Sequence, residues 1–128
     1  MNKQVLIAED EPYIVESLGF VLSHAGYTVT AVDDGRKVLD CVKDQQPDVV
    51  ILDLMLPHRN GFEILKQLKN EETLKTIPIL MLTAKGQEQD RSTAEQLGVD
   101  AFITKPFSNR EVLDCVNKLS QRIDAGES

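Results

Sequence analysis

The sequence predicts an α/β domain in which five strands form one doubly wound parallel sheet with helices on both faces. Short apolar or β-branched runs alternate five times with longer segments of helical periodicity. Gly, Pro and capping residues stand at the boundaries between them. Right-handed crossovers between successive parallel strands then give an open (βα)5 sheet.

The five predicted strands are short. The first, third and fourth runs have no polar alternation, which is typical of central parallel strands that are covered on both faces. The second run alternates between polar and apolar residues, which favours an edge position. Pro47 and Pro78 stand just before the third and fourth runs, where a missing backbone N–H is tolerated. The predicted strands are Val5 to Ala8, Thr28 to Val32, Val49 to Leu52, Ile79 to Leu82 and Ala101 to Ile103.

Four of the five intervening segments carry an apolar stripe at helical spacing. The exception is the segment at residues 87–97, which is nearly all polar apart from Ala94 and Leu97, so we expect the fourth helix to be the least stable. The apolar positions of the other four helices are Ile14, Leu18, Val21, Leu22 and Ala25; Val38, Leu39 and Val42; Phe62, Leu65 and Leu68; and Val112, Leu113, Val116 and Leu119.

Helix ends are also marked in the sequence. Gly26 and Gly98 stand where a left-handed cap would end the first and fourth helices. Ser108 and Glu111 have the spacing of a capping box at the start of the fifth helix. We therefore expect one domain over residues 1–123, with residues 124–128 as a flexible C-terminal tail.

Composition excludes several classes of protein. The chain has 128 residues, of which 41% are hydrophobic and 27% charged, and its apolar runs are far shorter than the ~20 residues of a membrane span. A net charge of −7 offers no clustered basic face for phosphates. We expect a cytoplasmic protein with no membrane insertion and no direct contact with nucleic acid. Cys41 and Cys115 form no CxxC pair and are interpreted as free thiols that pack on helix faces.

Polar residues follow the predicted strands at the edge where ligands bind in open α/β sheets. The first strand runs into Glu9, Asp10 and Glu11, the third into Asp53, the fourth into Thr83, and the fifth into Thr104-Lys105-Pro106. Each has an ordinary structural explanation alone, as a helix-start acid, a cap or a surface charge. Together they predict one crevice.

The charges in that crevice imply a cation. Glu9, Asp10 and Asp53 against Lys105 leave two net negative charges. Two carboxylates ~4 Å apart repel by ~4 kcal/mol at an effective dielectric near ~20, so a divalent ion is expected to balance them. Hard oxygen ligands without nearby His or Cys favour Mg²⁺, with Mn²⁺ possible.

Asp53 stands alone at the end of a wholly apolar strand, which would hold it on the rigid centre of the sheet as a nucleophile. Lys105 and the hydroxyl of Thr83 would then be donors to the developing phosphoryl charge. Cation, lysine and hydroxyl supply much of the positioning and charge neutralisation that phosphoryl transfer requires.

Four ordered motifs carry a family resemblance: the chain resembles the receiver domain of response regulators in two-component signalling, a CheY-like domain. The resemblance covers essentially the whole chain and implies a flavodoxin-like strand order of 2-1-3-4-5. The motifs are Ile7-Ala8-Glu9-Asp10-Glu11-Pro12; Asp53-Leu54-Met55-Leu56-Pro57 with Gly61; Met81-Leu82-Thr83-Ala84; and Ala101-Phe102-Ile103-Thr104-Lys105-Pro106-Phe107.

The resemblance implies that Asp53 is the phosphoacceptor, which a histidine kinase or a histidine phosphotransfer protein phosphorylates in a Mg²⁺-dependent reaction. Slow autodephosphorylation would follow. Glu9 and Asp10 match the acidic pair that holds the ion, and the backbone carbonyl of Met55 adds a ligand. Lys85 and Met55 occupy variable positions that tune how fast the phosphoryl group is lost.

The switch is implied in the same way. Thr83 matches the hydroxyl that moves to the phosphoryl group, and Lys105 matches the lysine that pairs with it, followed by a cis bond to Pro106. Phe102 matches the aromatic residue that turns inward on activation. That movement alters the face built from the fourth helix, the fifth strand and the fifth helix, through which a downstream target or output domain is contacted.

The chain also departs from the pattern. Its acidic pair is Glu9-Asp10 where two aspartates are more usual, which keeps the charge but changes the reach. Receivers that dimerise like the winged-helix regulators usually have an arginine at the position of Cys115 and an acid at that of Ala101. Of the charged residues in that pattern, this chain has only Arg91. The two mismatches disfavour that mode of dimerisation. We expect first a stand-alone receiver domain, and second a receiver domain excised from a longer regulator.

Three other functions are less well supported. A phosphatase of the haloacid-dehalogenase type would need a second aspartate where this chain has Met55. A flavodoxin-like FMN carrier would need a Ser/Thr/Gly-rich phosphate loop in place of the acidic run at residues 9–11. An atypical receiver could act without phosphorylation, although every expected group is present here. The expected activity is that of a signalling domain, not an enzyme.

Overall fold

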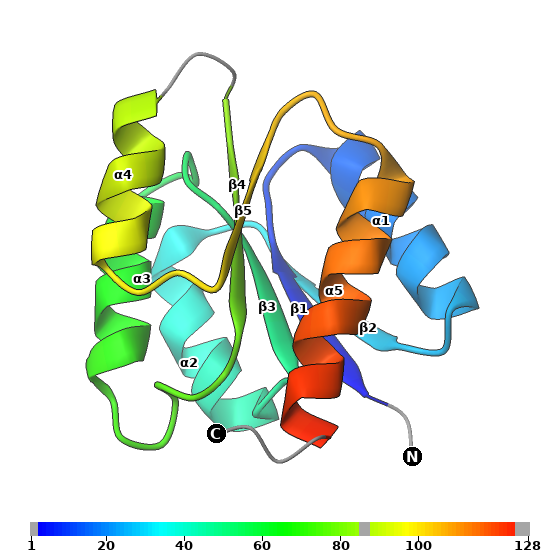
Figure 1. The fold of residues 1–128 in the computed structure, drawn as a ribbon, viewed down its shortest axis with the longest axis horizontal. Coiled ribbons are helices and arrows are strands. Elements are labelled where there is room, and N and C mark those ends of the chain that lie inside the picture. Colours follow the sequence, from blue (N-terminus) through cyan, green and yellow to red (C-terminus); the bar gives the residue numbers. More distant parts are fainter. Residues whose placement is uncertain (1–2, 85–87, 125–128) are drawn as a thin grey trace.

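A computed structural model of the chain describes residues 3–84 and 88–124. Five strands form one parallel sheet, as the sequence predicted, in the order β2-β1-β3-β4-β5 that the family resemblance implied (Figure 1). None of the described helices is both long and apolar enough to cross a membrane. The elements are β1 (Gln4–Ala8), α1 (Pro12–His24), β2 (Thr28–Val32), α2 (Gly35–Gln45), β3 (Val49–Asp53), α3 (Gly61–Asn70), β4 (Ile79–Thr83), α4 (Glu88–Gln96), β5 (Ala101–Thr104) and α5 (Asn109–Asp124).

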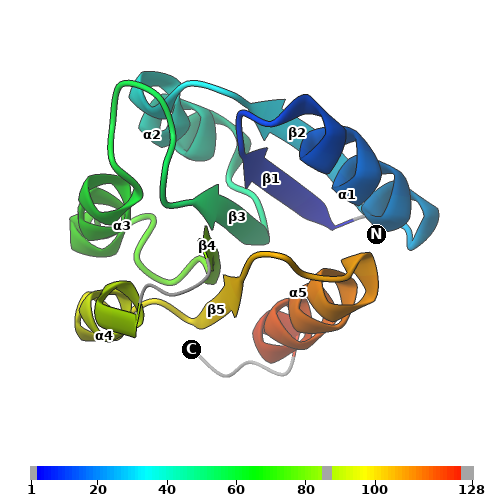
Figure 2. The ribbon, with the colours of Figure 1, turned by 90° about the horizontal axis from the view of Figure 1, so that it is seen from above.

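Three layers make up the domain. Helices α1 and α5 cover one face of the sheet, and α2, α3 and α4 cover the other (Figure 2). Side chains of one strand point to opposite faces, so Leu6 packs with the α2–α3–α4 side and Ile7 with the α1–α5 side. All five residues of β3 and of β4 are buried, which explains the unbroken apolar runs.

The predicted helix ends are confirmed in large part. Gly26 and Gly98 have positive φ of 102° and 90° after the ends of α1 and α4, a conformation that glycine adopts without strain. The hydroxyl of Ser108 accepts a 3.0 Å hydrogen bond from the backbone N–H of Glu111 at the start of α5. Ala25, predicted on the apolar stripe, is instead an exposed residue just past the end of α1.

Helix α4 has the sparse contact with the core that its composition predicted. Ala94 is its one buried residue. The C-terminal boundary differs slightly from expectation, because α5 extends to Asp124, the first residue of the predicted tail. The remaining tail residues lie outside the part of the chain that the structure describes.

Candidate phosphoryl-transfer site

The register of the sheet brings the predicted residues to one edge. Ala8 pairs with Leu52, so Glu9 and Asp53 follow neighbouring positions on β1 and β3. The last residue of β4, Thr83, pairs with Thr104, and Lys105 comes next. Residues far apart in the sequence therefore meet at the carboxyl end of the sheet because parallel strands end together.

Three carboxylates gather there. Glu9, Asp10 and Asp53 each offer an oxygen that lies within 4.8 Å of the other two. Glu9 and Asp53 are buried, with 0% and 2% of their surface exposed, whereas Asp10 is exposed to solvent. The predicted cluster of acids thus exists, with one side open.

Glu9 is held by backbone donors. Its Oε2 atom accepts hydrogen bonds from the N–H groups of Asp10 and Glu11, at 3.1 and 3.2 Å. Burial, together with a hydrogen bond to Asp53 and repulsion from its charge, raises the pKa of Glu9 to about 7. In the metal-free protein, this carboxyl therefore holds its proton to a much higher pH than an ordinary glutamate does.

Asp53 is fixed by the loop that follows it. Its Oδ1 atom accepts a 3.2 Å hydrogen bond from the N–H of Met55. The loop returns at Gly61, whose N–H donates to the carbonyl of Leu54 over 2.9 Å. A Cβ at Gly61 would lie 2.7 Å from the Leu54 Cα atom, so glycine permits this close approach.

Lys105 supplies the positive charge. Its Nζ atom lies 3.2 Å from Oε1 of Glu9, 3.3 Å from Oε1 of Glu11 and 3.5 Å from Oδ2 of Asp53. Burial alone would lower the pKa of the Lys105 ammonium, but Asp53, Glu9 and Glu11 outweigh that effect and raise it. The lysine stays charged and partly offsets the three acids.

Thr83 presents an unusual hydroxyl. The side chain is 2% exposed, and its Oγ1 atom has no hydrogen-bond partner among the described residues. Oε1 of Glu9 is likewise buried without a well-formed hydrogen bond, although it lies near the ammonium of Lys105. Since buried polar atoms are normally paired, the hydroxyl of Thr83 points to a ligand of the site, whereas Oε1 of Glu9 has its ion pair with Lys105.

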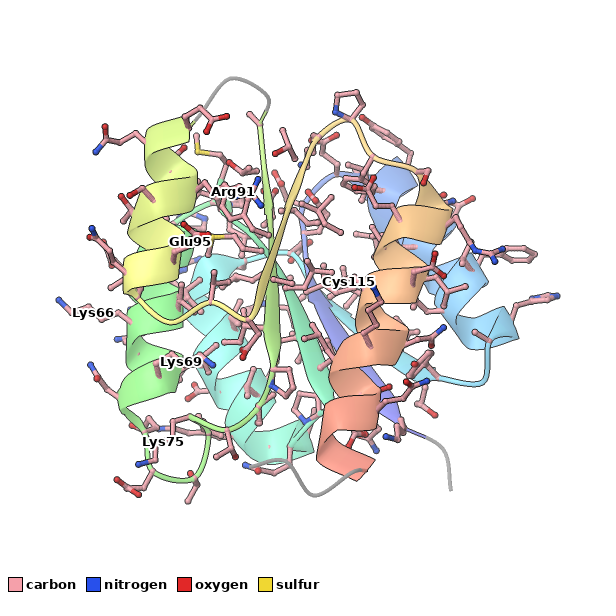
Figure 3. The ribbon with its side chains drawn as sticks, in the orientation of Figure 1. Lys66, Lys69, Lys75, Arg91, Glu95 and Cys115 are labelled. Carbon is pink, nitrogen blue, oxygen red and sulfur yellow. The ribbon has the colours of Figure 1, made fainter. Side chains whose placement is uncertain are left out.

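Phe102 lies on β5 beside α4. Its ring is half-buried, and the Arg91 guanidinium carbon lies 5.5 Å from the ring centroid, a cation–π distance. Figure 3 shows Arg91 on α4 and Cys115 on α5, on opposite sides of β5. The bond between Lys105 and Pro106 is cis, as the family resemblance implied.

Sequence reasoning missed the contact between Glu11 and Lys105. It placed Glu11 at the end of the first strand but gave its carboxylate no role in the site, whereas this carboxylate is an ion-pair partner of Lys105; the third acid in the run at residues 9–11 was the available signal. Lys85 lies outside the described residues. Cys41 and Cys115 are, as expected, free thiols, and they pack at the edges of the two cores; His24 and His58 are exposed.

The arrangement defines a doubly wound α/β domain with a buried carboxylate, two further acids and a lysine at its sheet edge. The sequence model of the response regulator receiver domain matches residues 5–117. The chain therefore belongs to the receiver-domain family of two-component response regulators.

Individual relatives agree with that membership. The chain is 42% identical over 122 residues to the alkaline phosphatase synthesis transcriptional regulatory protein PhoP of Bacillus subtilis, covering 95% of this chain and 50% of that protein. The structure of chemotaxis response regulator CheY4 of Vibrio cholerae has a TM-score of 0.86 and 28% identity, over 93% of this chain and 99% of that one.

One solved neighbour bears on the acidic cluster. The receiver domain of a sensor histidine kinase from Pseudomonas aeruginosa has a TM-score of 0.82 and 27% identity, over 94% of this chain and 99% of that one, and holds a magnesium ion in its active-site cleft. The present chain spans about half the length of the curated relatives it matches, at 50%, 56% and 54% of their lengths.

Proposed function

We propose that Asp53 accepts a phosphoryl group from a phosphohistidine of a histidine kinase or a histidine phosphotransfer protein, and that water later removes it slowly. The observation that carries this proposal is the position of Asp53. Its buried carboxylate lies within 4.8 Å of the ligand oxygens of Glu9 and Asp10, and 3.5 Å from the ammonium of Lys105.

The acids fit a divalent cation. Glu9, Asp10 and Asp53 offer hard oxygen ligands, and Asp10 keeps the group open to water. We assign the ion as Mg²⁺, which Mn²⁺ can replace, with the backbone carbonyl of Met55 as a fourth ligand. When bound, the ion would neutralise charge on the phosphoryl oxygens.

The chemistry asked of the chain is a single displacement. An oxygen of Asp53 attacks phosphorus, a P–O bond forms, the P–N bond to the donor imidazole breaks, and the imidazole leaves with the bonding electron pair. Lys105 neutralises charge on the transferred group. Hydrolysis of the acyl phosphate by water then returns the Asp53 carboxylate and releases inorganic phosphate.

We assign the hydroxyl of Thr83 as a hydrogen-bond donor to the phosphoryl group. Formation of this contact would signal that Asp53 is phosphorylated. The hydroxyl is buried and lacks a hydrogen-bond partner within the described chain, so an acceptor beside Asp53 would satisfy it. Movement of Thr83 leaves space behind it that the ring of Phe102 can fill. Met55 is 69% exposed next to Asp53 and, with Lys85, is proposed to control the access of water.

The output is proposed to pass through α4, β5 and α5. A change at Phe102 alters this face, which would contact a downstream target or an output domain. The curated relatives PhoP and PhoB are transcriptional regulatory proteins, but the net charge of −7 disfavours nucleic-acid contact by this chain itself. We propose a cytoplasmic signalling domain that catalyses only its own phosphotransfer and dephosphorylation, not a phosphatase with external substrates.

Phosphorylation of the purified chain by a small phosphodonor, with Mg²⁺, tests the proposal. The wild type is expected to gain one acid-stable, base-labile phosphoryl group by mass spectrometry, and Asp53→Asn to gain none while keeping the thermal unfolding transition of a folded domain. Asp48→Asn is the matched control and should be labelled normally, because Asp48 lies just before β3, at the end of that strand away from the site. Labelling of Asp53→Asn to the wild-type extent would overturn the assignment.

A further inference from the structure

Lys105 is shared among more carboxylates than phosphoryl transfer requires. An ammonium has three N–H donors, and three carboxylates lie within 3.5 Å of this one. Glu11, at 3.3 Å, is nearer to the Nζ atom than Asp53, at 3.5 Å. In the resting protein the ammonium donates hydrogen bonds to Glu11 and Asp53 and forms an ion pair with Glu9.

Glu11 differs from the other two partners of Lys105. It lies outside the group of acids whose oxygens converge on a cation position. It is the residue before α1, yet its side chain makes no capping hydrogen bond to the helix, so the carboxylate is available to the lysine. A hydrogen bond from the Tyr13 hydroxyl also engages the carboxylate and, with Lys105, lowers the pKa of Glu11.

We propose that Glu11 is a positioning residue that competes with the phosphoryl group for Lys105, and so lowers the affinity of the site for that group. This inference rests on the proposed function of Asp53. Its structural basis is the contact between Glu11 Oε1 and Lys105 Nζ at the edge of the acidic cluster.

The competition persists through the reaction. A bound cation would draw Glu9 away from the lysine, and formation of the acyl phosphate consumes the negative charge of Asp53. Glu11 is the partner that neither event removes. The phosphoryl group must then share the ammonium with this carboxylate, whose own charge also opposes the incoming one.

The ion pair between Glu11 and Lys105 lies beside open space. A cavity of about 440 Å³ adjoins the site, and Glu11 and Lys105 both line it, together with Tyr13 and Phe107. The side chains of Lys105 and Glu11 are 22% and 38% exposed, so the pair is partly solvated. Such an ion pair is strong enough to favour contact of Lys105 with Glu11, and weak enough for a phosphoryl group to break it.

Binding of beryllofluoride with Mg²⁺, followed by amide chemical shifts, tests the inference. Glu11→Gln keeps the shape of the side chain and removes its charge, and should tighten binding by about two- to fivefold, the range of a partly exposed ion pair. Asp33→Asn is the matched control for the general field: Asp33 is an exposed acid that lines a second cavity with Glu9 and Asp10. The Asp33→Asn variant should change the affinity for beryllofluoride by much less than Glu11→Gln does.

The outcomes are distinct. If Glu11→Gln and Asp33→Asn tightened beryllofluoride binding equally, the effect would be one of overall charge and the inference would be overturned. Unchanged or weaker beryllofluoride binding by Glu11→Gln would also overturn it. Weaker binding would mean that Glu11 anchors the lysine instead of competing for it. If the wild type failed to bind beryllofluoride at all, the proposed function itself would fail. Thermal unfolding of each variant verifies that the fold is kept.

Discussion

The backbone N–H of Lys105 donates a 2.7 Å hydrogen bond to the carbonyl oxygen of Thr83. The pairing of β4 with β5 therefore continues one residue past the end of β5, into the site. This bond fixes the backbone of the lysine relative to that of the threonine, while their side chains remain free to change partners. The hydroxyl of Thr83, which has no partner in the described part of the chain, and the shared ammonium of Lys105 are thus held on backbone that is fixed in relative position.

Thr83→Val should stabilise the resting protein. The hydroxyl is buried without a partner among the described residues, and a methyl of the same shape removes its desolvation penalty, so we expect the free energy of unfolding to rise by about 1 kcal/mol. Urea denaturation measures this. The exposed Thr104 on β5 provides the control Thr104→Val, which should stay within about 0.5 kcal/mol of the wild type. A comparable loss of stability in Thr83→Val would mean that the hydroxyl is hydrogen-bonded in the resting protein.

The stability of the metal-free protein should depend on Glu9. The pKa of this carboxyl is raised from 4.5 to about 7 on folding, so between these values the folded protein holds a proton that the unfolded chain releases. This contribution to stability is fully present below about pH 4.5 and is lost as the pH rises to about 7. Thermal unfolding across this range should show a decline that Glu9→Gln reduces.

Magnesium should oppose that decline, because a cation substitutes for the proton and binds better once Glu9 is ionised. Millimolar Mg²⁺ should therefore raise the melting temperature more at pH 8 than at pH 5. An equal shift at both values, or none, would argue against a site that includes Glu9.

Lys105→Ala should destabilise the metal-free protein by about 1 to 2 kcal/mol, because it leaves the clustered carboxylates without their ammonium. Mg²⁺ should restore much of this lost stability. Phosphoryl labelling of Asp53 should be largely lost in Lys105→Ala even though the domain stays folded. Lys37→Ala, at an exposed position of α2, is the control. A loss of stability that Mg²⁺ leaves unchanged would indicate a purely structural lysine.

Gly61→Ala should cost about 1 to 3 kcal/mol, because the added methyl would lie 2.7 Å from the Leu54 Cα and 3.0 Å from the carbonyl oxygen of Asp53. Gly19→Ala is the contrasting variant in α1, where nothing lies within 4 Å of the added Cβ. It should stabilise the helix by about 0.5 to 1 kcal/mol. Chemical denaturation of both variants checks the pair, and similar effects of the two would contradict the close approach at Gly61.

Local patterns were sufficient to predict the strands and helices, while the order of the strands came from the family resemblance. Apolar runs and caps such as Gly26 depend on neighbours along the chain, and the acids after β1 and β3 meet because parallel strands end at one edge. What escaped prediction depends on distant side chains. Leu74, between α3 and β4, is fully buried, although no periodic pattern surrounds it. The contact of Glu11 with Lys105 likewise needs the coordinates of two loops.

Helix α4 carries a single buried side chain, the methyl of Ala94, whereas α3 buries Ile64, Leu65 and Leu68 besides Gly61. Detaching α4 from the sheet exposes little apolar surface, so thermal fluctuations open it at low free-energy cost. Its backbone amides should exchange with deuterium well before those of α3. A surface attached this loosely can be remodelled by a signal as small as one added phosphate, while the rest of the domain keeps its shape.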